Sequence, residues 1–410
     1  MKIGYLMELG EEVRRPPFNG PANHVRQVML ELDRLGHTVR LLIRLEGVIW
    51  KSDDLQDFQP VFVQKIDQGA LRSLERLVRR IQYELKLPYA AFFESLRFAL
   101  ACQQELPGFD LFFERSSWMA YGGMLASGRQ KVPLVIEYNG DPLADLEAKN
   151  AAPHGIQRRL SAALMRKYLN SAAHLVATGA GWKVNCVEKW GIAADKISTV
   201  ENGTELVQLL ERGQLRSFQP SSVPGEPVTL AYLGGFYAWH GVDVLLHALS
   251  RAAAQGCELE LILIGSGAGE EEARQLARQL GITDRVSFKG QLTTREFAPL
   301  LAGADIGLSP YCGWAEFSGL KIFDYKAAGL PTVASGKDGQ PHTLQHGQTG
   351  WIVPPCDEDA LTEAILYLYS NPEVRRRLGQ QARLEAEQIH GWDHTARQLE
   401  QIFRQALAHG

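Results

Sequence analysis

Two carboxylates, a loop of small residues and a lysine follow one another in one short segment of the chain. Glu316 precedes Ser318 and Gly319, and Asp324 lies eight positions after Glu316. The spacing of apolar residues predicts a helix over about 320–328 that begins at this loop. Because the N-terminus of a helix carries free N–H groups and partial positive charge, the segment predicts a phosphate site.

The side chains of this segment fit a nucleotide that carries a sugar. Lys321 adds a cation to the N–H groups of Ser318, Gly319 and Leu320 at the helix start. Asp324, one turn further on, is positioned to accept both hydroxyls of a ribose, while Glu316 reaches a sugar beyond the diphosphate. The alternative is that each carboxylate is a solvated surface charge, which is the usual state of an isolated Glu or Asp.

Short apolar runs alternate with longer amphipathic segments throughout the chain, which is typical of βα units in an α/β protein with parallel sheets. Two similar sets of runs predict two Rossmann-like halves. The expected strands are Lys2–Leu6, Thr38–Ile43, Leu111–Glu114, Pro133–Glu137, His174–Ala177 and Ile197–Val200, then Val228–Leu233, Glu258–Ile264, Val286–Lys289, Ile306–Ser309 and Thr332–Ala334.

A segment rich in Pro, Ser and Gly separates the two halves. We therefore expect a first domain over 1–205, a linker over 206–227 and a second domain over 228–390. A chain of 410 residues is long enough for two cores.

Composition excludes several classes of protein. With 43 basic and 47 acidic residues the formal charge is −4, which argues against disorder and against nucleic-acid binding through overall positive charge. No apolar run approaches the length of a membrane span, and glutamates interrupt the N-terminus before a signal peptide forms. We expect a cytoplasmic protein, at most peripheral at the inner face of the plasma membrane.

The five cysteines, Cys102, Cys186, Cys257, Cys312 and Cys356, are far apart, odd in number and form no CxxC pair. We expect them to be reduced, buried and structural. The carboxylate spacings suggest no metal site either.

Two segments of the first half combine arginines with apolar residues at helical spacing. They are 71–102, which Pro88 divides in two, and 156–168. Either these are surface helices that pack their apolar sides on the domain, or they form a patch that faces anionic lipid.

The run from Gly265 to Glu270 resembles a dinucleotide fingerprint but fails it. Its third glycine position is Glu270, and two further glutamates at the helix start would repel a pyrophosphate.

The segment 316–335 resembles the Glu-x7-Glu motif of family 4 glycosyltransferases, retaining enzymes of the GT-B fold, in which Asp324 replaces the usual second Glu. The resemblance implies two Rossmann-like domains that face each other across a cleft, with a terminal helix, 391–410, that crosses back to the first domain. It covers nearly the whole chain. The residues it associates with the donor are Gly20, Gly234, Gly235, Phe236, Gly265, Gln291, Leu292, Phe317, Ser318, Gly319, Leu320 and Asp324.

The chain departs from that family pattern at the diphosphate. Gly235 and His240 stand where an Arg and a Lys are usual, so Lys321 and the helix N-terminus must carry most of the positive charge. His240 could assist if it were protonated, and we assign Glu316, Lys321 and His240 to catalysis.

The first half resembles the family more loosely. Gly20 lies in the expected phosphate-covering loop, and His24 after it fits packing or ligand contact equally. The usual His near the transferred sugar is absent, and the candidates to take its place are Glu137, Asn139 and Asp141. The turn 201–205 is expected to be structural.

The implied activity is transfer of a sugar, glucose first, from a nucleotide diphosphate donor to a hydroxyl of a saccharide or lipid-linked oligosaccharide. UDP-glucose is the first expectation and GDP-mannose the alternative; the nucleotide sugar is a substrate, and neither cofactor nor metal is expected. The rival functions are a nucleotide-sugar 2-epimerase of the same fold and a non-catalytic nucleotide-sugar-binding protein.

Overall fold

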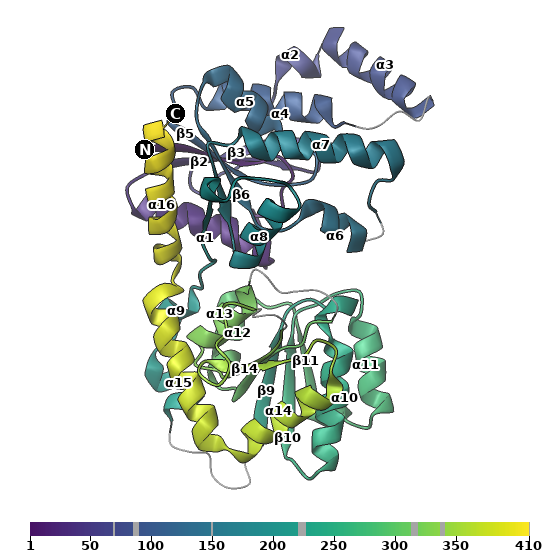
Figure 1. Cartoon of the computed structure of the whole chain (residues 1–410), viewed down its shortest axis with the longest axis vertical. Helices are drawn as coiled ribbons and strands as arrows, with labels where there is room; N and C mark the ends of the chain where they lie inside the picture. The colour runs from purple at the N-terminus through teal and green to yellow at the C-terminus, as the bar shows by residue number, and fades with distance from the viewer. Residues whose placement is uncertain are drawn as a thin grey trace. The chain divides into compact units, whose positions relative to one another are not determined.

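The computed structural model describes residues 1–68, 70–84, 90–148, 151–219, 227–312, 319–336 and 341–409. The chain forms two compact units (Figure 1). The first contains 1–201 together with 395–410, and the second contains 202–394. Each unit is an α/β sandwich whose sheet is covered by helices, so the predicted fold class is confirmed.

The first unit is built on an eight-stranded sheet in the order β4-β3-β2-β1-β5-β6-β7-β8. Pairing is parallel except between β2, β3 and β4, which are antiparallel. The strands are β1 (Lys2–Met7), β2 (Thr38–Leu45), β3 (Val48–Ser52), β4 (Gln59–Val61), β5 (Leu111–Arg115), β6 (Leu134–Tyr138), β7 (His174–Ala177) and β8 (Ile197–Thr199).

Helices flank this sheet on both faces. They are α1 (Gly20–Arg34), α2 (Gln64–Asp67), α3 (Ala70–Glu84), α4 (Phe92–Glu105), α5 (Gly122–Gln130), α6 (Pro142–Ala148), α7 (Gly155–Ser171), α8 (Ala180–Glu188) and the C-terminal α16 (Trp392–His409). The Asn19 side chain caps α1 by accepting a hydrogen bond from Ala22 N at 2.9 Å. Most of α16 belongs to this unit, since Phe403 packs on Phe113 of β5 at 5.1 Å.

The second unit has a parallel six-stranded sheet in the order β11-β10-β9-β12-β13-β14. Its strands are β9 (Val228–Leu233), β10 (Leu259–Ile264), β11 (Val286–Gly290), β12 (Ile306–Ser309), β13 (Thr332–Ser335) and β14 (Gly350–Val353). Its helices are α9 (Leu206–Leu209), α10 (Val242–Ala254), α11 (Glu270–Gln279), α12 (Thr294–Ala302), α13 (Leu320–Ala327), α14 (Glu358–Ser370) and α15 (Pro372–Ile389).

Every predicted strand is present, with ends that differ by a residue or two, while β3, β4 and β14 were not predicted. The segment 206–227, predicted to be a linker, is in part a packed region of the second unit. Leu206, Leu210 and Leu215 are buried in the core of the second unit, so the part up to residue 219 is packed structure. Within the described residues, no helix is both long and apolar enough to span a bilayer.

Candidate active site

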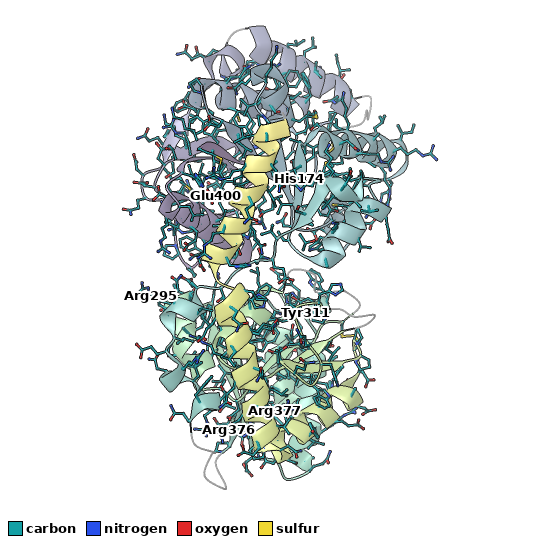
Figure 2. The ribbon with its side chains drawn as sticks, turned by 60° about the vertical axis from the view of Figure 1, so that its left-hand side comes forward. His174, Arg295, Tyr311, Arg376, Arg377 and Glu400 are labelled. Atoms are coloured by element: carbon teal, nitrogen blue, oxygen red, sulfur yellow. A yellow bond between two sulfur atoms is a disulfide. The ribbon has the colours of Figure 1, made fainter. Side chains whose placement is uncertain are left out.

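The carboxyl ends of β9 and β12 bring the main candidate residues together. These strands are neighbours in the sheet, but the chain leaves β9 toward β10 and returns on the other side at β12. Such a switch in strand order is where open α/β sheets bind ligands. Gly234 and Gly235 follow β9, Tyr311 follows β12 (Figure 2), and α13 begins beside them.

Lys321, in the first turn of α13, extends toward the end of β9. Its side chain is buried, and its Nζ lies 4.9 Å from the ring centroid of Tyr232 and 4.6 Å from that of Tyr311. A Cβ placed on Gly234 would be 3.0 Å from the same Nζ. The ammonium is therefore held by two aromatic rings against the backbone that follows β9.

Gly234 and Gly265 allow the loops after β9 and β10 to touch. A Cβ on Gly265 would lie 2.0 Å from the carbonyl oxygen of Gly234, and the φ angle of Gly265 is +131°. Both the space and the backbone conformation therefore require glycine. Of these two residues, Gly234 lies beside the Lys321 ammonium, and Gly265 packs behind it.

Phe236, predicted to contact the donor, is buried in the core of the second unit. Its ring stacks on Phe288 at 6.1 Å, its N–H donates to Ser266 O, and its carbonyl accepts from Gly269 N. These two backbone hydrogen bonds join the segment after β9 to the loop after β10. Gln291 is exposed beyond β11, whereas Leu292 packs partly into the core.

His240 is held as a neutral imidazole rather than a cation. Burial, with Lys321 nearby, lowers its pKa to about 4. The ring Nδ1 lies 2.6 Å from the carbonyl oxygen of Gly235, which only accepts, so Nδ1 carries the proton and Nε2 is an acceptor. Without a bound diphosphate, His240 is therefore neutral near neutral pH.

Two tyrosines complete this arrangement. Tyr232 donates from its hydroxyl to the same Gly235 carbonyl at 2.7 Å, and the Tyr311 ring meets the His240 ring edge-on at 4.9 Å. Sequence reasoning missed both tyrosines. Their position could have identified them, because both lie at the carboxyl ends of the two strands that flank the switch point.

Asp324 contacts the polypeptide at the start of the second unit. Its Oδ1 accepts a hydrogen bond from the Thr204 hydroxyl at 2.7 Å. Burial raises the pKa of Asp324 to about 7, with a further increase from the charge of Glu205, although Thr204 opposes the shift. Thr204 lies in the turn that was expected to be only structural, and it shares this carboxyl with any ligand that binds there.

Glu316, Phe317 and Ser318 lie outside the residues that the structure describes. The described part of the motif begins at Gly319, which precedes α13 with φ +58°, a conformation suited to glycine. Leu320 is the first residue of α13, so the predicted helix start is confirmed.

A disulfide joins Cys312 to Cys356, with Cα atoms 4.8 Å apart. The prediction that all five cysteines are reduced is therefore wrong for this pair. They are 44 residues apart in sequence, but one follows β12 and the other follows β14, so the parallel strands bring them to the same edge. Cys102, Cys186 and Cys257 are free and buried, as predicted.

A second polar cluster lies at the carboxyl edge of the sheet in the first unit. Arg115 of β5 is in register with Glu137 of β6, so both side chains lie on the face covered by α1. His24 Nε2 is 2.7 Å from Glu137 Oε1, and Arg115 donates to Glu137 Oε2 at 2.9 Å. With its amide oxygen toward Arg115, Asn139 accepts from Nε at 2.8 Å.

The charges in this cluster compensate one another. Burial would raise the pKa of Glu137, but His24 and Arg115 outweigh it and hold the pKa below its usual value. His24, for which packing and ligand contact were equally open, is a partner of Glu137. Arg115 was not predicted from the sequence, because it meets Glu137 only through the pairing of β5 with β6.

Asp141 and Gly20 have different environments. Asp141 is buried at the start of α6, where it accepts from Leu143 N at 3.0 Å and pairs with Lys189. These contacts cap the N-terminus of α6. Gly20 is the exposed first residue of α1.

Across the described ranges, no group of three or more His, Cys, Asp or Glu side chains is arranged to hold a metal ion.

Two family models match the chain, one to each unit. Residues 19–203 match a glycosyl transferase 4-like domain, and residues 214–385 match glycosyl transferases group 1. A D-inositol 3-phosphate glycosyltransferase from Saccharomonospora viridis is 27% identical over 399 residues, which is 94% of this chain and 89% of that protein.

Solved structures agree in fold. The sucrose-phosphate synthase of Thermosynechococcus elongatus matches with a TM-score of 0.72 and 21% identity over 100% of both chains. Anabaena HepE, in complex with UDP and glucose, matches with a TM-score of 0.67 and 18% identity over 99% of this chain and 100% of that chain. The fold and site thus define a GT-B glycosyltransferase. The chain belongs to family 4 of these enzymes.

Proposed function

We propose that the protein transfers a hexosyl group, glucose first, from a nucleoside diphosphate sugar to a hydroxyl of a saccharide or lipid-linked oligosaccharide in polysaccharide biosynthesis, with retention of configuration. The observation that carries the proposal is the Lys321 ammonium held against Gly234 at the switch point of the second unit. A diphosphate seated on this backbone would meet that cation and the N-terminus of α13.

The proposed chemistry needs positive charge where the leaving group becomes negative. The bond from the sugar C1 to the β-phosphate oxygen breaks, and a bond from C1 to the acceptor oxygen forms. The acceptor proton passes to the departing phosphate, so no protein base is required. Lys321 stabilises the growing charge on the diphosphate. Glu316 orients the sugar hydroxyls, and Asp324 binds the ribose.

Because His240 is neutral, its role differs from that of the cation that the family pattern has at this position. With its proton on Nδ1, it presents Nε2 as a hydrogen-bond acceptor. We assign that lone pair to a hydroxyl of the bound donor. Gly234, Gly235 and Gly265 then approach the diphosphate through their backbone alone.

No metal ion is part of the proposal, because Lys321 and the α13 N-terminus supply the positive charge that a metal would otherwise supply. Turnover of the purified protein should be unchanged, within about twofold, after chelation with EDTA and in the presence of added Mg²⁺ or Mn²⁺. A large loss on chelation that added metal restores would contradict this assignment.

UDP-glucose is the first donor to test, and the HepE complex with UDP and glucose supports that order. GDP-mannose is the alternative. The acceptor is assigned to the first unit, where Glu137 and Asn139 stand with His24 and Arg115 at the carboxyl edge of the sheet. With a lipid-linked acceptor, the protein would act at the inner face of the plasma membrane.

Two measurements test the function. Thermal-shift screening against UDP, GDP, ADP and their sugars should give one nucleotide that raises the melting temperature in proportion to its occupancy. Consumption of the best donor should then require an acceptor. Conversion of the donor without acceptor would identify the rival 2-epimerase, and binding without any conversion would identify a nucleotide-sugar-binding protein.

A further inference from the structure

The disulfide between Cys312 and Cys356 connects two segments at the carboxyl edge of the second unit's sheet. Cys312 follows β12 and Cys356 follows β14, and β13 lies between these two strands. Strands that are two places apart in a sheet are separated by about 9–10 Å. Because the two Cα atoms are only 4.8 Å apart, the two segments converge over the end of β13, and the bridge holds them there.

The segment that carries Cys312 packs against the loop after β9. The Cys312 N–H donates to the carbonyl oxygen of Trp239 at 2.9 Å. A Cβ placed on Gly241 would lie 1.8 Å from the carbonyl oxygen of Pro310 and 3.5 Å from Cys312 Sγ, so the two backbones touch at this point. The position of the segment 310–312 is therefore coupled to that of the loop that carries His240.

Tyr311, which directly precedes Cys312, belongs to the arrangement around Lys321 (Figure 2 labels Tyr311). The centroid of its ring is 4.6 Å from Lys321 Nζ and 4.9 Å from the centroid of the His240 ring. A residue that positions the ammonium is thus the immediate neighbour of a residue that the disulfide anchors. A covalent change at Cys312 reaches Lys321 through one side chain, that of Tyr311.

The disulfide is accessible from solvent, whereas the free cysteines are not. Cys356 is exposed and Cys312 is half-buried. Cys102, Cys186 and Cys257 are buried, and burial raises the pKa of each of these thiols. Thiol–disulfide exchange needs both access and a thiolate. A soluble thiol or disulfide therefore reaches the bridged pair in preference to the three buried thiols.

We propose that Cys312 and Cys356 form a redox modification site, at which thiol–disulfide exchange changes how firmly Tyr311 is held against Lys321. The reductant is a dithiol, and the oxidant is a low-molecular-weight disulfide. The oxidised pair keeps the segment 310–312 against the loop after β9, and reduction releases it. The effect on donor binding rests on the proposed function, whereas the exchange itself does not.

Reduction takes two exchange steps. A thiolate of the dithiol attacks the exposed Cys356 Sγ, which forms a mixed disulfide, breaks the bond to Cys312 and releases Cys312 as a thiolate. The second thiolate of the reductant then forms the reductant's own disulfide and displaces Cys356 as a thiolate. The protein gains two electrons, which the reductant loses. The two protons lost by the reductant's thiols neutralise the two cysteine thiolates, and oxidation is the reverse sequence.

Mapping of the thiols in the intact protein tests the exchange without any donor. After treatment with dithiothreitol, iodoacetamide should alkylate Cys312 and Cys356, as peptide mass spectrometry measures, while the three buried cysteines stay unmodified. Oxidised glutathione should then restore the bridge. A pair that resists dithiothreitol in the folded protein, or that is still alkylated after treatment with oxidised glutathione, would overturn the proposal.

Amide hydrogen exchange distinguishes a local switch from a bridge that only stabilises the fold. On reduction, exchange should accelerate about tenfold or more at residue 312 and in the loop 234–241, and should stay unchanged in β10. The hydrogen bond from Cys312 N to Trp239 O makes the first of these amides a direct reporter of the contact. Unchanged exchange at both places, or loss of protection throughout the second unit, would overturn the proposal.

Two variants complete the test. C312S/C356S should exchange like the reduced protein and should not respond to dithiothreitol, whereas Cys257→Ala, which keeps the pair, should respond as the unchanged protein does. With UDP as the probe, calorimetry should show about tenfold weaker binding to the reduced protein than to the oxidised protein. Equal affinity in the two redox states would overturn the link to Lys321. A protein that binds no UDP in either state would contradict the proposed UDP-sugar donor, and the exchange measurements would still decide the redox site.

Discussion

Lys321 supplies the positive charge of the proposed diphosphate site, where Gly235 and His240 replace the usual Arg and Lys. Gly235 has no side-chain charge, and His240 is neutral because burial and Lys321 itself lower its pKa to about 4. The ammonium lies 4.9 Å from the ring centroid of Tyr232 and 4.6 Å from that of Tyr311. Two aromatic rings therefore fix the position of this charge beside the backbone that follows β9.

Substitution of Lys321 by Ala should lower kcat by about 10²- to 10³-fold, since one charged group that stabilises the leaving diphosphate is lost. Steady-state kinetics with the best donor would measure this loss. Lys131→Ala, at an exposed position after α5, is the control and should retain full activity. Normal turnover of the Lys321 variant would remove the residue from the catalytic assignment.

Asp324 should make nucleotide binding depend on pH. Its pKa of about 7 means that the carboxyl is protonated below neutrality and ionised above it. Because the carboxylate is the better acceptor for ribose hydroxyls, affinity for the nucleotide should rise up to about tenfold between about pH 6 and pH 8.

Calorimetric titration with the nucleotide across this pH range would measure the effect. In the Asp324→Asn variant, the part of the pH dependence of nucleotide affinity that comes from ionisation of Asp324 should be lost. Titration of the nucleotide phosphate is common to both proteins and cancels in the comparison. Identical pH dependence in the two proteins would contradict the ribose assignment.

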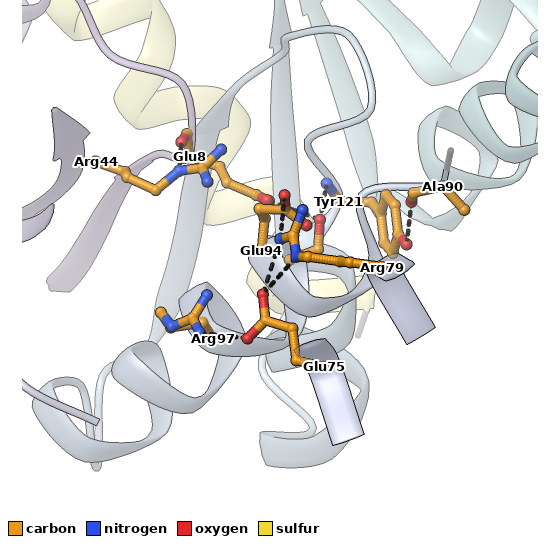
Figure 3. Close-up of polar contacts among 9 residues, drawn as sticks. Glu8, Arg44, Glu75, Arg79, Ala90, Glu94, Arg97 and Tyr121 are labelled. Atoms are coloured by element: carbon orange, nitrogen blue, oxygen red, sulfur yellow. Dashed lines mark hydrogen bonds and ion pairs between the residues drawn. The ribbon is translucent and has the colours of Figure 1, made fainter. Parts of the chain in front are cut away.

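At the scale of the elements, two buried carboxyls meet the N-terminus of α5. Glu8, after β1, accepts from Gly122 N at 2.6 Å and from the Ser95 hydroxyl at 2.7 Å, and Glu114 of β5 accepts from Gly123 N at 3.1 Å. Burial raises the pKa of Glu8 to about 7 and that of Glu114 to about 8. At neutral pH in the folded protein, Glu114 is therefore largely protonated and Glu8 is about half protonated (Figure 3 labels Glu8).

This shift should make the first unit less stable as pH rises. In the unfolded chain Glu8 ionises near its ordinary pKa of 4.5, while in the folded chain the pKa is about 7. Folding therefore takes up a proton between these values, and stability falls across that window, on the order of 3 kcal/mol for Glu8 alone by pH 8.

Glu8→Gln mimics the protonated carboxyl and should flatten the decline. Urea unfolding of the variant and of the unchanged protein at several pH values would measure the difference. The prediction is contradicted if both proteins lose stability equally between about pH 5 and pH 8.

The regular elements were predictable because their signal is local. Buried runs such as Leu259–Ile264 identify the central strands, and the loop before residue 320 identifies the start of α13. The short strand β14 gave no such signal. Contacts set by strand order were not predictable either: His24 meets Glu137 across 113 residues, and Cys312 meets Cys356 across 44.

At the scale of the whole molecule, the first unit is discontinuous in sequence. Its core includes residues of α16, with Phe403 fully buried against Phe113 and Leu399 buried beside it in the helix. His37 also pairs with Glu400 of α16 at 3.3 Å (Figure 2 labels Glu400). The C-terminal helix is therefore part of the first unit's core.

Phe403→Ala should destabilise the first unit by about 3–5 kcal/mol, the usual cost of a large cavity in a core. Denaturant unfolding, followed by a probe in the first unit, would measure it. Leu407→Ala, at a more exposed position of the same helix, is the control and should cost much less. A stability change no larger for Phe403 than for Leu407 would contradict this account of the core.

The discontinuity also determines the order in which the molecule can be completed during translation. Residues 1–201 leave the ribosome first, but the surface around Phe113 remains without its cover until residues 395–409 have been synthesised. The second unit, 202–394, is contiguous and is complete earlier. The first unit to be made is thus the last to be finished, and its uncovered sheet is the part of the nascent chain that most needs protection from aggregation.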